Sequence, residues 1–276
     1  LLLQKPDGFL RQVAAEAFTA PLAEKYAVGQ VFLSPDPAKS SEQKSLLEAA
    51  LEAQGLLVPG WRCVPTEPEV LGPIALESMP GIEQVFVQAE GELSDQEFEV
   101  ALFVARRKCE LAVGEDEHFY ISSLSCAVLS YKGLMMPADL TLFYPDLADP
   151  RMETAICVFH QRFSTNTLPR WPLAQPFRYL AHNGEINTIT GNRNWAEART
   201  SKFKTSLLPD IEALSPLVNR TGSDSSSLDN MLEVLLAGGM NINRAISTLV
   251  PPAWQNVEDL DPDERAFFEY SSMHME

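Results

Sequence analysis

The first half of the chain alternates between helix-like and strand-like spacings of its apolar residues. Apolar positions three or four residues apart predict helices over residues 9–18, 40–54 and 94–113. β-Branched and aromatic residues predict strands over residues 26–33 and 82–89, and two successive strands within residues 119–131. Lys132-Gly133 is the predicted turn at the end of this last pair.

Two of the predicted helices begin with a recognisable capping pattern. Ser40 is followed three residues later by Gln43, and Ser94 is followed three residues later by Glu97. In such a capping box the serine and the acidic or amide side chain satisfy each other's free backbone N–H groups. The sequence therefore predicts that these two helices begin at Ser40 and Ser94.

The pattern changes in the second half of the chain. A Pro-rich connection over residues 137–150 leads to the apolar run 155–159, which is the best candidate for a buried strand. Residues 161–227 are rich in Asn, Thr, Ser, Gly and Arg, and helical spacing returns over residues 228–236, 242–250 and 262–270. Strands without regular strand–helix alternation favour a layered α+β fold over a doubly wound parallel sheet.

Composition and charge narrow the function classes. The chain has 276 residues, is 45% hydrophobic and carries a formal net charge of -17, so it can bury one substantial core or two small ones. Such a charge repels phosphate backbones and anionic lipid surfaces, so neither nucleic acid nor a membrane is an expected partner. No apolar run approaches the roughly 20 residues that cross a bilayer, and residues 1–5 do not resemble a secretory signal, so a cytoplasmic protein is expected.

The four cysteines, Cys63, Cys109, Cys126 and Cys157, form no C-x-x-C pair, so no zinc or iron–sulfur site is predicted. Cys109, Cys126 and Cys157 stand in apolar surroundings and are expected to be buried, reduced thiols. The chain begins without Met, and residues 1–3 have the pattern of a strand interior. We therefore expect a fragment of a longer polypeptide, incomplete at both ends.

Three short clusters in the polar stretch carry the candidate chemistry. They are His160-Gln161-Arg162-Phe163-Ser164-Thr165, Ala181-His182-Asn183-Gly184-Glu185-Ile186 and Thr221-Gly222-Ser223-Asp224-Ser225-Ser226-Ser227. Each has an ordinary explanation when it is taken alone: a solvated arginine, an Asn-Gly turn and a helix N-cap. The clusters become informative only in combination.

In combination, the clusters resemble the class II glutamine amidotransferases of the N-terminal-nucleophile type, which carry an R-x-[ST]-T-like cluster, then H-N-G, then S-D. The strings at residues 170–177, 187–193 and 251–255 narrow the resemblance to the amidotransferase domains of glutamate synthases. This resemblance extends over essentially the whole chain.

Chemistry gives four of these residues a reason to be there. Arg162 is the candidate clamp for the α-carboxylate of glutamine, because a guanidinium binds a carboxylate through two parallel hydrogen bonds. Asp224 is the candidate partner of the α-ammonium group. Asn183 and Gly184 can offer a side-chain and a backbone N–H to the oxyanion that forms at the amide carbon. The resemblance implies the same four roles at these positions.

The resemblance assigns no catalytic role to His182 or His160, and both are expected to be structural. In the family, the α-amino group of an N-terminal cysteine acts as the base for its own thiol. All four cysteines here are internal, so the nucleophile is expected upstream of Leu1 and the isolated chain is expected to be inactive.

The resemblance implies a four-layer αββα sandwich with two antiparallel sheets face to face. It implies an enzyme that hydrolyses L-glutamine and passes the ammonia to a synthase domain of the same chain, where 2-oxoglutarate is reductively aminated to glutamate. FMN and an iron–sulfur cluster are implied elsewhere in that enzyme and none in this segment, and a flavin-containing small subunit is a further candidate partner.

Two alternatives remain open from the sequence. One is another class II amidotransferase that makes a purine precursor, an amino sugar or asparagine. The other is a non-catalytic binding module of the same fold. The strings at residues 170–177 and 187–193 argue against the first, and the intact set of Arg162, Asn183, Gly184 and Asp224 argues against the second.

Overall fold

The computed structural model describes residues 1–163 and 167–275 and contains strands and helices in mixed order. The strands are β1 (Leu2–Gln4), β2 (Ala27–Leu33), β3 (Leu56–Cys63), β4 (Gly81–Ala89), β5 (Tyr120–Ser125), β6 (Val128–Ser130) and β7 (Cys157–Val158). The helices are α1 (Asp7–Ala17), α2 (Pro37–Glu52), α3 (Pro73–Glu77), α4 (Asp95–Val113), α5 (Leu140–Phe143), α6 (Ile189–Arg199), α7 (Asp224–Ala237), α8 (Ile242–Leu249) and α9 (Pro262–Met275).

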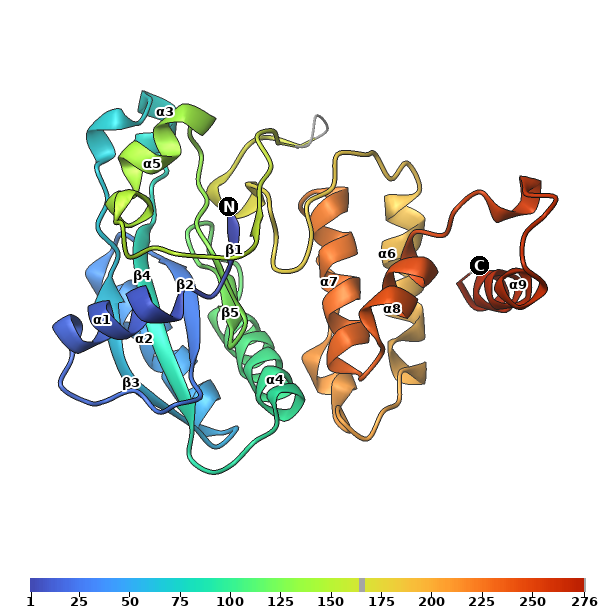
Figure 1. The fold of residues 1–276 in the computed structure, drawn as a ribbon, viewed down its shortest axis with the longest axis horizontal. Coiled ribbons are helices and arrows are strands. Elements are labelled where there is room, and N and C mark those ends of the chain that lie inside the picture. Colours follow the sequence, from blue (N-terminus) through green and yellow to red (C-terminus); the bar gives the residue numbers. More distant parts are fainter. Residues whose placement is uncertain (164–166, 276) are drawn as a thin grey trace.

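A four-stranded antiparallel sheet in the order β3-β4-β2-β5 organises the first half of the molecule (Figure 1). Every residue of β2 is buried, because β4 and β5 pair with it on its two sides and apolar side chains pack on both of its faces. Val28 and Phe32 point to one face, and Val31 and Leu33 to the other, as the two-residue period of a strand requires. The predicted strands at 26–33 and 82–89 are confirmed.

Helices α2 and α4 cover one face of this sheet and share one apolar core with it. The predicted capping box of α4 is confirmed: Ser94 Oγ accepts from the N–H of Glu97, and the Glu97 carboxylate accepts from the N–H of Ser94. The predicted start of α2 at Ser40 is wrong. Asp36 caps this helix by accepting from two backbone N–H groups, and Pro37 occupies its first turn.

A second, three-stranded antiparallel sheet in the order β6-β1-β7 packs with α1 against the other face of the first sheet. Leu3 and Leu129 of this sheet share a core with Val28 and Phe32 of β2. The two predicted strands at 119–131 are confirmed, with the connection between them at residues 126–127. The turn predicted after them at Lys132-Gly133 is not present as a turn.

The prediction of a buried strand over residues 155–159 is wrong. The strand β7 is two residues long and forms the edge of its sheet, and the side chains of Ile156 and Phe159 are 62% and 64% exposed. An apolar run is buried only where another element covers it, and no described element covers this one. Cys157 is therefore exposed, contrary to the expectation from its apolar neighbours.

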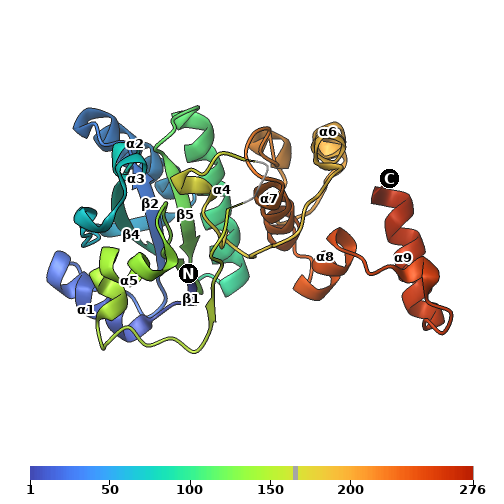
Figure 2. The same ribbon diagram turned by 90° about the horizontal axis from the view of Figure 1, so that it is seen from above.

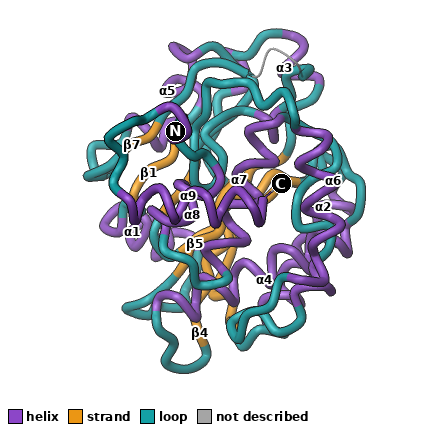
Figure 3. Tube along the Cα trace, turned by 90° about the vertical axis from the view of Figure 1, so that its right-hand side faces the viewer, coloured by secondary structure: helices purple, strands orange, loops and turns teal. Residues whose placement is uncertain are grey.

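The second half of the chain is helical and docks on the outer side of α4 (Figures 1 and 2). Phe103 of α4 joins Val234 and Ala237 of α7 in a third apolar cluster, which also contains Ile211 and Leu214. Helix α4 therefore lies between the main sheet and the helical half, and Figure 3 shows the helical half from its own side. The predicted helices at 228–236, 242–250 and 262–270 are present with longer or slightly shifted ends.

The observed architecture confirms an α+β fold with two antiparallel sheets. Strand β3 and the helices α3, α5 and α6 escaped prediction. Strand β3 contains Pro59 and Gly60, which a sequence reader takes for a turn, but β3 is an edge strand with an irregular register there and tolerates both. Helix α6 lies in the polar stretch and has no buried residue in its body. Within residues 1–163 and 167–275, no helix has the length and apolar character needed to cross a membrane.

Candidate functional site

The H-N-G segment is held in place by a glutamine side chain that comes from the preceding loop. Gln175, which is buried, makes two hydrogen bonds to the main chain of His182. Its Oε1 accepts from the N–H of His182 at 2.8 Å, and its Nε2 donates to the carbonyl oxygen of His182 at 3.0 Å. This pairing fixes the backbone of the residue immediately before Asn183.

The imidazole of His182 lies directly against Gly184. A Cβ atom at Gly184 would stand 2.6 Å from His182 Nε2, which no side chain can tolerate without displacing the ring. His182 Nδ1 also shares a hydrogen bond of 2.9 Å with the buried Ser225 hydroxyl of α7. Asn183 and Gly184 themselves are exposed. These contacts give His182 a structural place in the loop, which agrees with the role expected for it.

Asp224 is the first residue of α7, and Ser223 is its N-cap. The Ser223 hydroxyl accepts from the N–H of Ser226 at 3.1 Å, so the ordinary N-cap explanation of this cluster is correct as far as it goes. The Asp224 carboxylate accepts from the backbone N–H of Ile186 at 2.8 Å and from the N–H of Ser225 at 2.7 Å. The first of these bonds ties Asp224 directly to the segment that contains Asn183 and Gly184.

The structure therefore brings three of the four predicted site residues together. Arg162 stands apart: among the described residues, no hydrogen bond or ion pair joins it to Asn183 or to Asp224. Its side chain is exposed at a cavity of about 150 Å³ that Lys132 and Gln175 also line. Gln175 is thus shared between the cavity at Arg162 and the H-N-G loop.

His160 has a local task beside Arg162. Its Nδ1 accepts from the backbone N–H of Arg162 at 3.1 Å, which orders the turn that carries the arginine. This contact agrees with the structural role expected for His160. Ser164 and Thr165 of the same predicted cluster lie outside the described residues.

A buried ionic network anchors the loop between these two parts of the site. The guanidinium of Arg178 donates to the Ile121 carbonyl oxygen of β5 at 2.6 Å and to Glu110 of α4 at 3.1 Å. Asp229 of α7, which is fully buried, accepts from the backbone N–H groups of Arg178 and Tyr179. The loop is thereby tied to the main sheet, to α4 and to α7.

The network perturbs the ionisation of both carboxylates. Burial by itself would raise the pKa of Glu110, but the charges of Arg106, Arg178 and Arg107 outweigh burial and lower its pKa to about 2. Burial and the neighbouring Glu233 raise the pKa of Asp229 to about 6. Glu110 therefore stays ionised with its arginines, whereas Asp229 pays a cost in its charged form.

Two of the four internal cysteines lack the surroundings of an activated nucleophile. Burial raises the pKa of Cys109 to about 12, and burial with the adjacent Glu99 raises that of Cys126 to about 12. Cys63 and Cys157 are exposed on strands β3 and β7, and all four thiols are free. Cys109 is buried as expected, Cys126 is partly buried, and only the expectation for Cys157 fails outright.

Within the described ranges, no three His, Cys, Asp or Glu side chains are grouped so that they could hold a metal ion. No pattern in the sequence indicated the residues that hold the H-N-G loop and the segment before it in place. These are Gln175, Arg178, Ser225 and Asp229. Gln175 belongs to the string 170–177 on which the resemblance rests. Nothing in the sequence indicated that its side chain would bind the backbone of His182.

An α+β fold with two antiparallel sheets, an H-N-G loop and an Asp at a helix start together define a class of protein. The family model of the class-II glutamine amidotransferases matches residues 1–276, and the chain belongs to this family.

Named relatives of the chain include glutamate synthases. The chain is 40% identical over 279 residues to the glutamate synthase (NADPH) large chain of Bacillus subtilis, which covers 100% of this chain and 18% of that protein. It is 42% identical over 257 residues to the ferredoxin-dependent glutamate synthase of Pyropia yezoensis, covering 90% and 16% respectively. The glutamate synthase (NADH) of Schizosaccharomyces pombe is 37% identical over 266 residues, covering 94% and 13%. The chain thus spans less than a fifth of the length of these relatives.

Proposed function

We propose that this chain is the glutamine-hydrolysing domain of a glutamate synthase, in which the released ammonia aminates 2-oxoglutarate reductively to glutamate. One observation carries the proposal: the Asp224 carboxylate is hydrogen-bonded to the segment that presents Asn183 and Gly184. A site for glutamine needs an anion for the α-ammonium group and N–H donors for the oxyanion within one small region.

The proposed roles follow from the chemistry of each group. A carboxylate has about four acceptor positions. Ile186 N–H, Ser225 N–H and Ser225 Oγ use three of them on Asp224, which leaves room for the ammonium group of the substrate. Asn183 and Gly184, both exposed, supply the oxyanion donors, and Arg162 closes on the α-carboxylate from its neighbouring cavity.

The attacking thiol is proposed to lie outside these 276 residues. The family mechanism needs a cysteine with a free α-amino group, and the first residue here is Leu1. The raised pKa values of Cys109 and Cys126 make these two thiols unsuitable as substitutes, because the thiolate is the nucleophilic form. A polypeptide of residues 1–276 alone is therefore proposed to be inactive.

The remaining features of the proposal concern the longer enzyme. The segment is a part of the amidotransferase domain, and its αββα sandwich is completed by residues outside it. FMN and an iron–sulfur cluster are proposed to bind elsewhere in the enzyme, as the similarity to glutamate synthases implies. Its partners are L-glutamine, the synthase domain of the same chain and a flavin-containing small subunit, and the enzyme works in the cytoplasm.

The test follows the amide nitrogen. Full-length protein is incubated with glutamine labelled with ¹⁵N in its amide, with 2-oxoglutarate and with a reductant. The proposal predicts ¹⁵N in the α-amino group of newly formed glutamate. Glutamine hydrolysis without such glutamate would identify another class II amidotransferase, and glutamine binding without hydrolysis would identify a binding module.

A further inference from the structure

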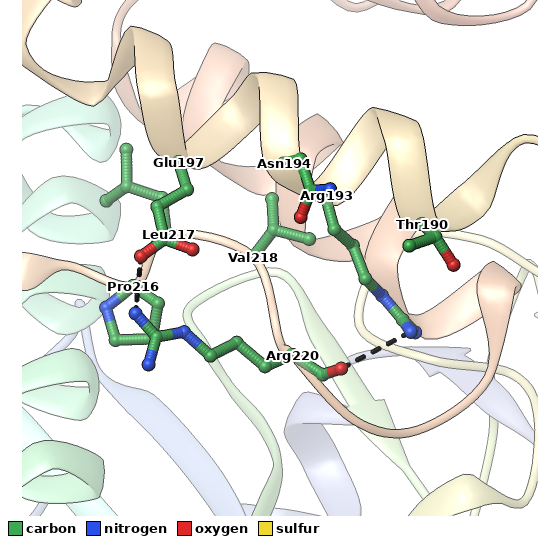
Figure 4. Close-up of a pocket in the computed structure, with 8 residues that line it drawn as sticks. All are labelled: Thr190, Arg193, Asn194, Glu197, Pro216, Leu217, Val218 and Arg220. Atoms are coloured by element: carbon green, nitrogen blue, oxygen red, sulfur yellow. Dashed lines mark hydrogen bonds and ion pairs between the residues drawn. The ribbon is translucent and has the colours of Figure 1, made fainter.

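A cavity of about 240 Å³ beside the site contains two arginines with different surroundings (Figure 4). Arg193 extends from α6, and Arg220 lies on the loop that leads to α7. The Arg220 guanidinium is exposed and pairs with Glu197 at 2.5 Å. Figure 4 shows Arg193 reaching across to the backbone of that loop instead.

The contacts of Arg193 converge on the residues just before and after Asp224. Its Nε donates to the Ser227 hydroxyl at 2.9 Å. Its Nη2 donates to the carbonyl oxygens of Gly222 at 3.1 Å and of Ser223 at 3.3 Å. One planar guanidinium thus holds two successive carbonyl groups and the first turn of α7, which a lysine ammonium could not match in geometry.

The backbone at this place needs such support. Gly222 has a φ of 107°, in the left-handed region that only glycine adopts readily, and the helix begins directly after Ser223. The direction of the Asp224 side chain follows from how these two residues enter α7. On its other side, α6 begins five residues after Gly184, so Arg193 links the segment after H-N-G to the segment before Asp224.

We propose that Arg193 is a positioning residue for the α-ammonium subsite: it fixes the entry into α7 and so aims the Asp224 carboxylate at the substrate, without touching the substrate. This inference rests on the proposed function. It adds to that function a residue whose loss affects recognition of the α-amino group selectively, since Asn183, Gly184 and Arg162 are held by other contacts.

A purely structural role for Arg193 predicts something different. A residue that only stabilises the fold would, when removed, weaken the reaction with every substrate alike. A positioning residue for one subsite would weaken it only for substrates that occupy the subsite. The comparison of glutamine with its analogue that lacks the α-amino group, glutaramate, separates the two roles.

The test uses the full-length protein and measures kcat/KM for both compounds. In Arg193→Met the preference for glutamine over glutaramate should fall about tenfold or more, as expected when a charge-assisted hydrogen bond is misaligned. The fall should appear mainly in KM for glutamine. Arg220→Met is the matched control, because it removes the other guanidinium that lines the same cavity. Its preference for glutamine over glutaramate should equal that of the unaltered protein.

Arg193→Lys keeps the charge and the aliphatic stem and provides a second variant should Arg193→Met fail to fold. It should show an intermediate preference, because a single ammonium group cannot hold both carbonyl groups. An equal loss for both compounds, or an unchanged preference in both variants, would overturn the inference while the proposed function stands. Absence of glutamine hydrolysis in the unaltered protein would overturn both.

Discussion

Gly184 and His182 show how closely the candidate oxyanion loop is packed. The imidazole stands where a side chain at position 184 would have to be, and its own place is fixed by Ser225 and by the Gln175 pairing. The position of the Gly184 backbone therefore depends on the contacts that hold His182.

Gly184→Ala is expected to lower kcat of glutamine hydrolysis by roughly 10²-fold, because displacement of the ring moves an oxyanion donor. Steady-state kinetics of the full-length enzyme measure the effect. Gly191→Ala is the control, since a Cβ at that position of α6 meets nothing within 4 Å. Equal kcat values for the two variants would show that the close approach at Gly184 has no catalytic consequence.

Arg162 and Asn183 lie on different parts of the site, and substitutions at the two positions should change different kinetic constants. Arg162→Ala removes a group that binds the α-carboxylate in the ground state and transition state alike, so we expect KM to rise strongly. Asn183→Ala removes a donor to a charge that exists only along the reaction path, so kcat should fall, at a cost of about 2.7–4 kcal/mol. The opposite pattern in kinetic measurements would exchange or cancel the two roles.

Helix α4 connects the two halves of the molecule through both its apolar and its charged side chains. Phe98 and Leu102 face the sheet, whereas Phe103 joins the cluster under α7. Glu110, near the end of the helix, binds Arg178 of the loop that leads to His182. The ionic state of one carboxylate on α4 therefore bears on the stability of the loop beneath the site.

Glu110→Gln is expected to destabilise this region at neutral pH. Lowering the pKa of Glu110 from 4.5 to about 2 corresponds to roughly 3 kcal/mol of stabilisation. Because the folded-state pKa is depressed, this stabilisation is present above pH 4.5 and is lost as the pH falls towards 2. Amide hydrogen exchange of α4 and residues 175–182 in the full-length protein measures it.

The difference between Glu110→Gln and the unaltered protein should be largest near pH 7 and should shrink as the pH falls below about 4.5. Glu115→Gln, at an exposed position just beyond the end of α4, provides the control and should change little at any pH. A difference independent of pH would mean that packing, and not the charge of Glu110, supports the loop.

Sequence patterns predicted features whose interacting residues lie within one helical turn. They failed where contacts with distant residues decide the structure. The Ser94–Glu97 pattern gave the start of α4 because both partners of the cap lie within one turn. The same pattern at Ser40 misled, because Gln43 turns inward and accepts from the buried N–H of Ser34. The apolar run at 155–159 misled since burial depends on what covers a strand, which no local pattern encodes.

In the candidate site, too, the sequence indicated some residues and not others. The resemblance and the chemistry of glutamine named Arg162, Asn183, Gly184 and Asp224, of which three now lie together. The residues that hold them had no such signal. Arg178 and Asp229 are 51 positions apart in sequence, and their contact follows only from the way the loop folds over α7.

At the scale of the whole molecule, the chain matches only part of the length of its relatives. Its relatives are glutamate synthases more than five times as long, and the described chain presents an exposed apolar edge at Ile156 and Phe159. The groups proposed to bind and polarise glutamine lie within the described residues, whereas the buried thiols of Cys109 and Cys126 have raised pKa values. We therefore propose a division of the reaction, in which these residues recognise the substrate and stabilise the oxyanion and a cysteine from outside them attacks.

Ammonia release from glutamine tests this division most directly. It is measured for residues 1–276 alone and for the full-length polypeptide, each with and without prior alkylation of its thiols. We expect no release above background from residues 1–276, and release from the full-length protein that alkylation abolishes. Release by residues 1–276 alone, or release that survives alkylation of the full-length protein, would contradict this division.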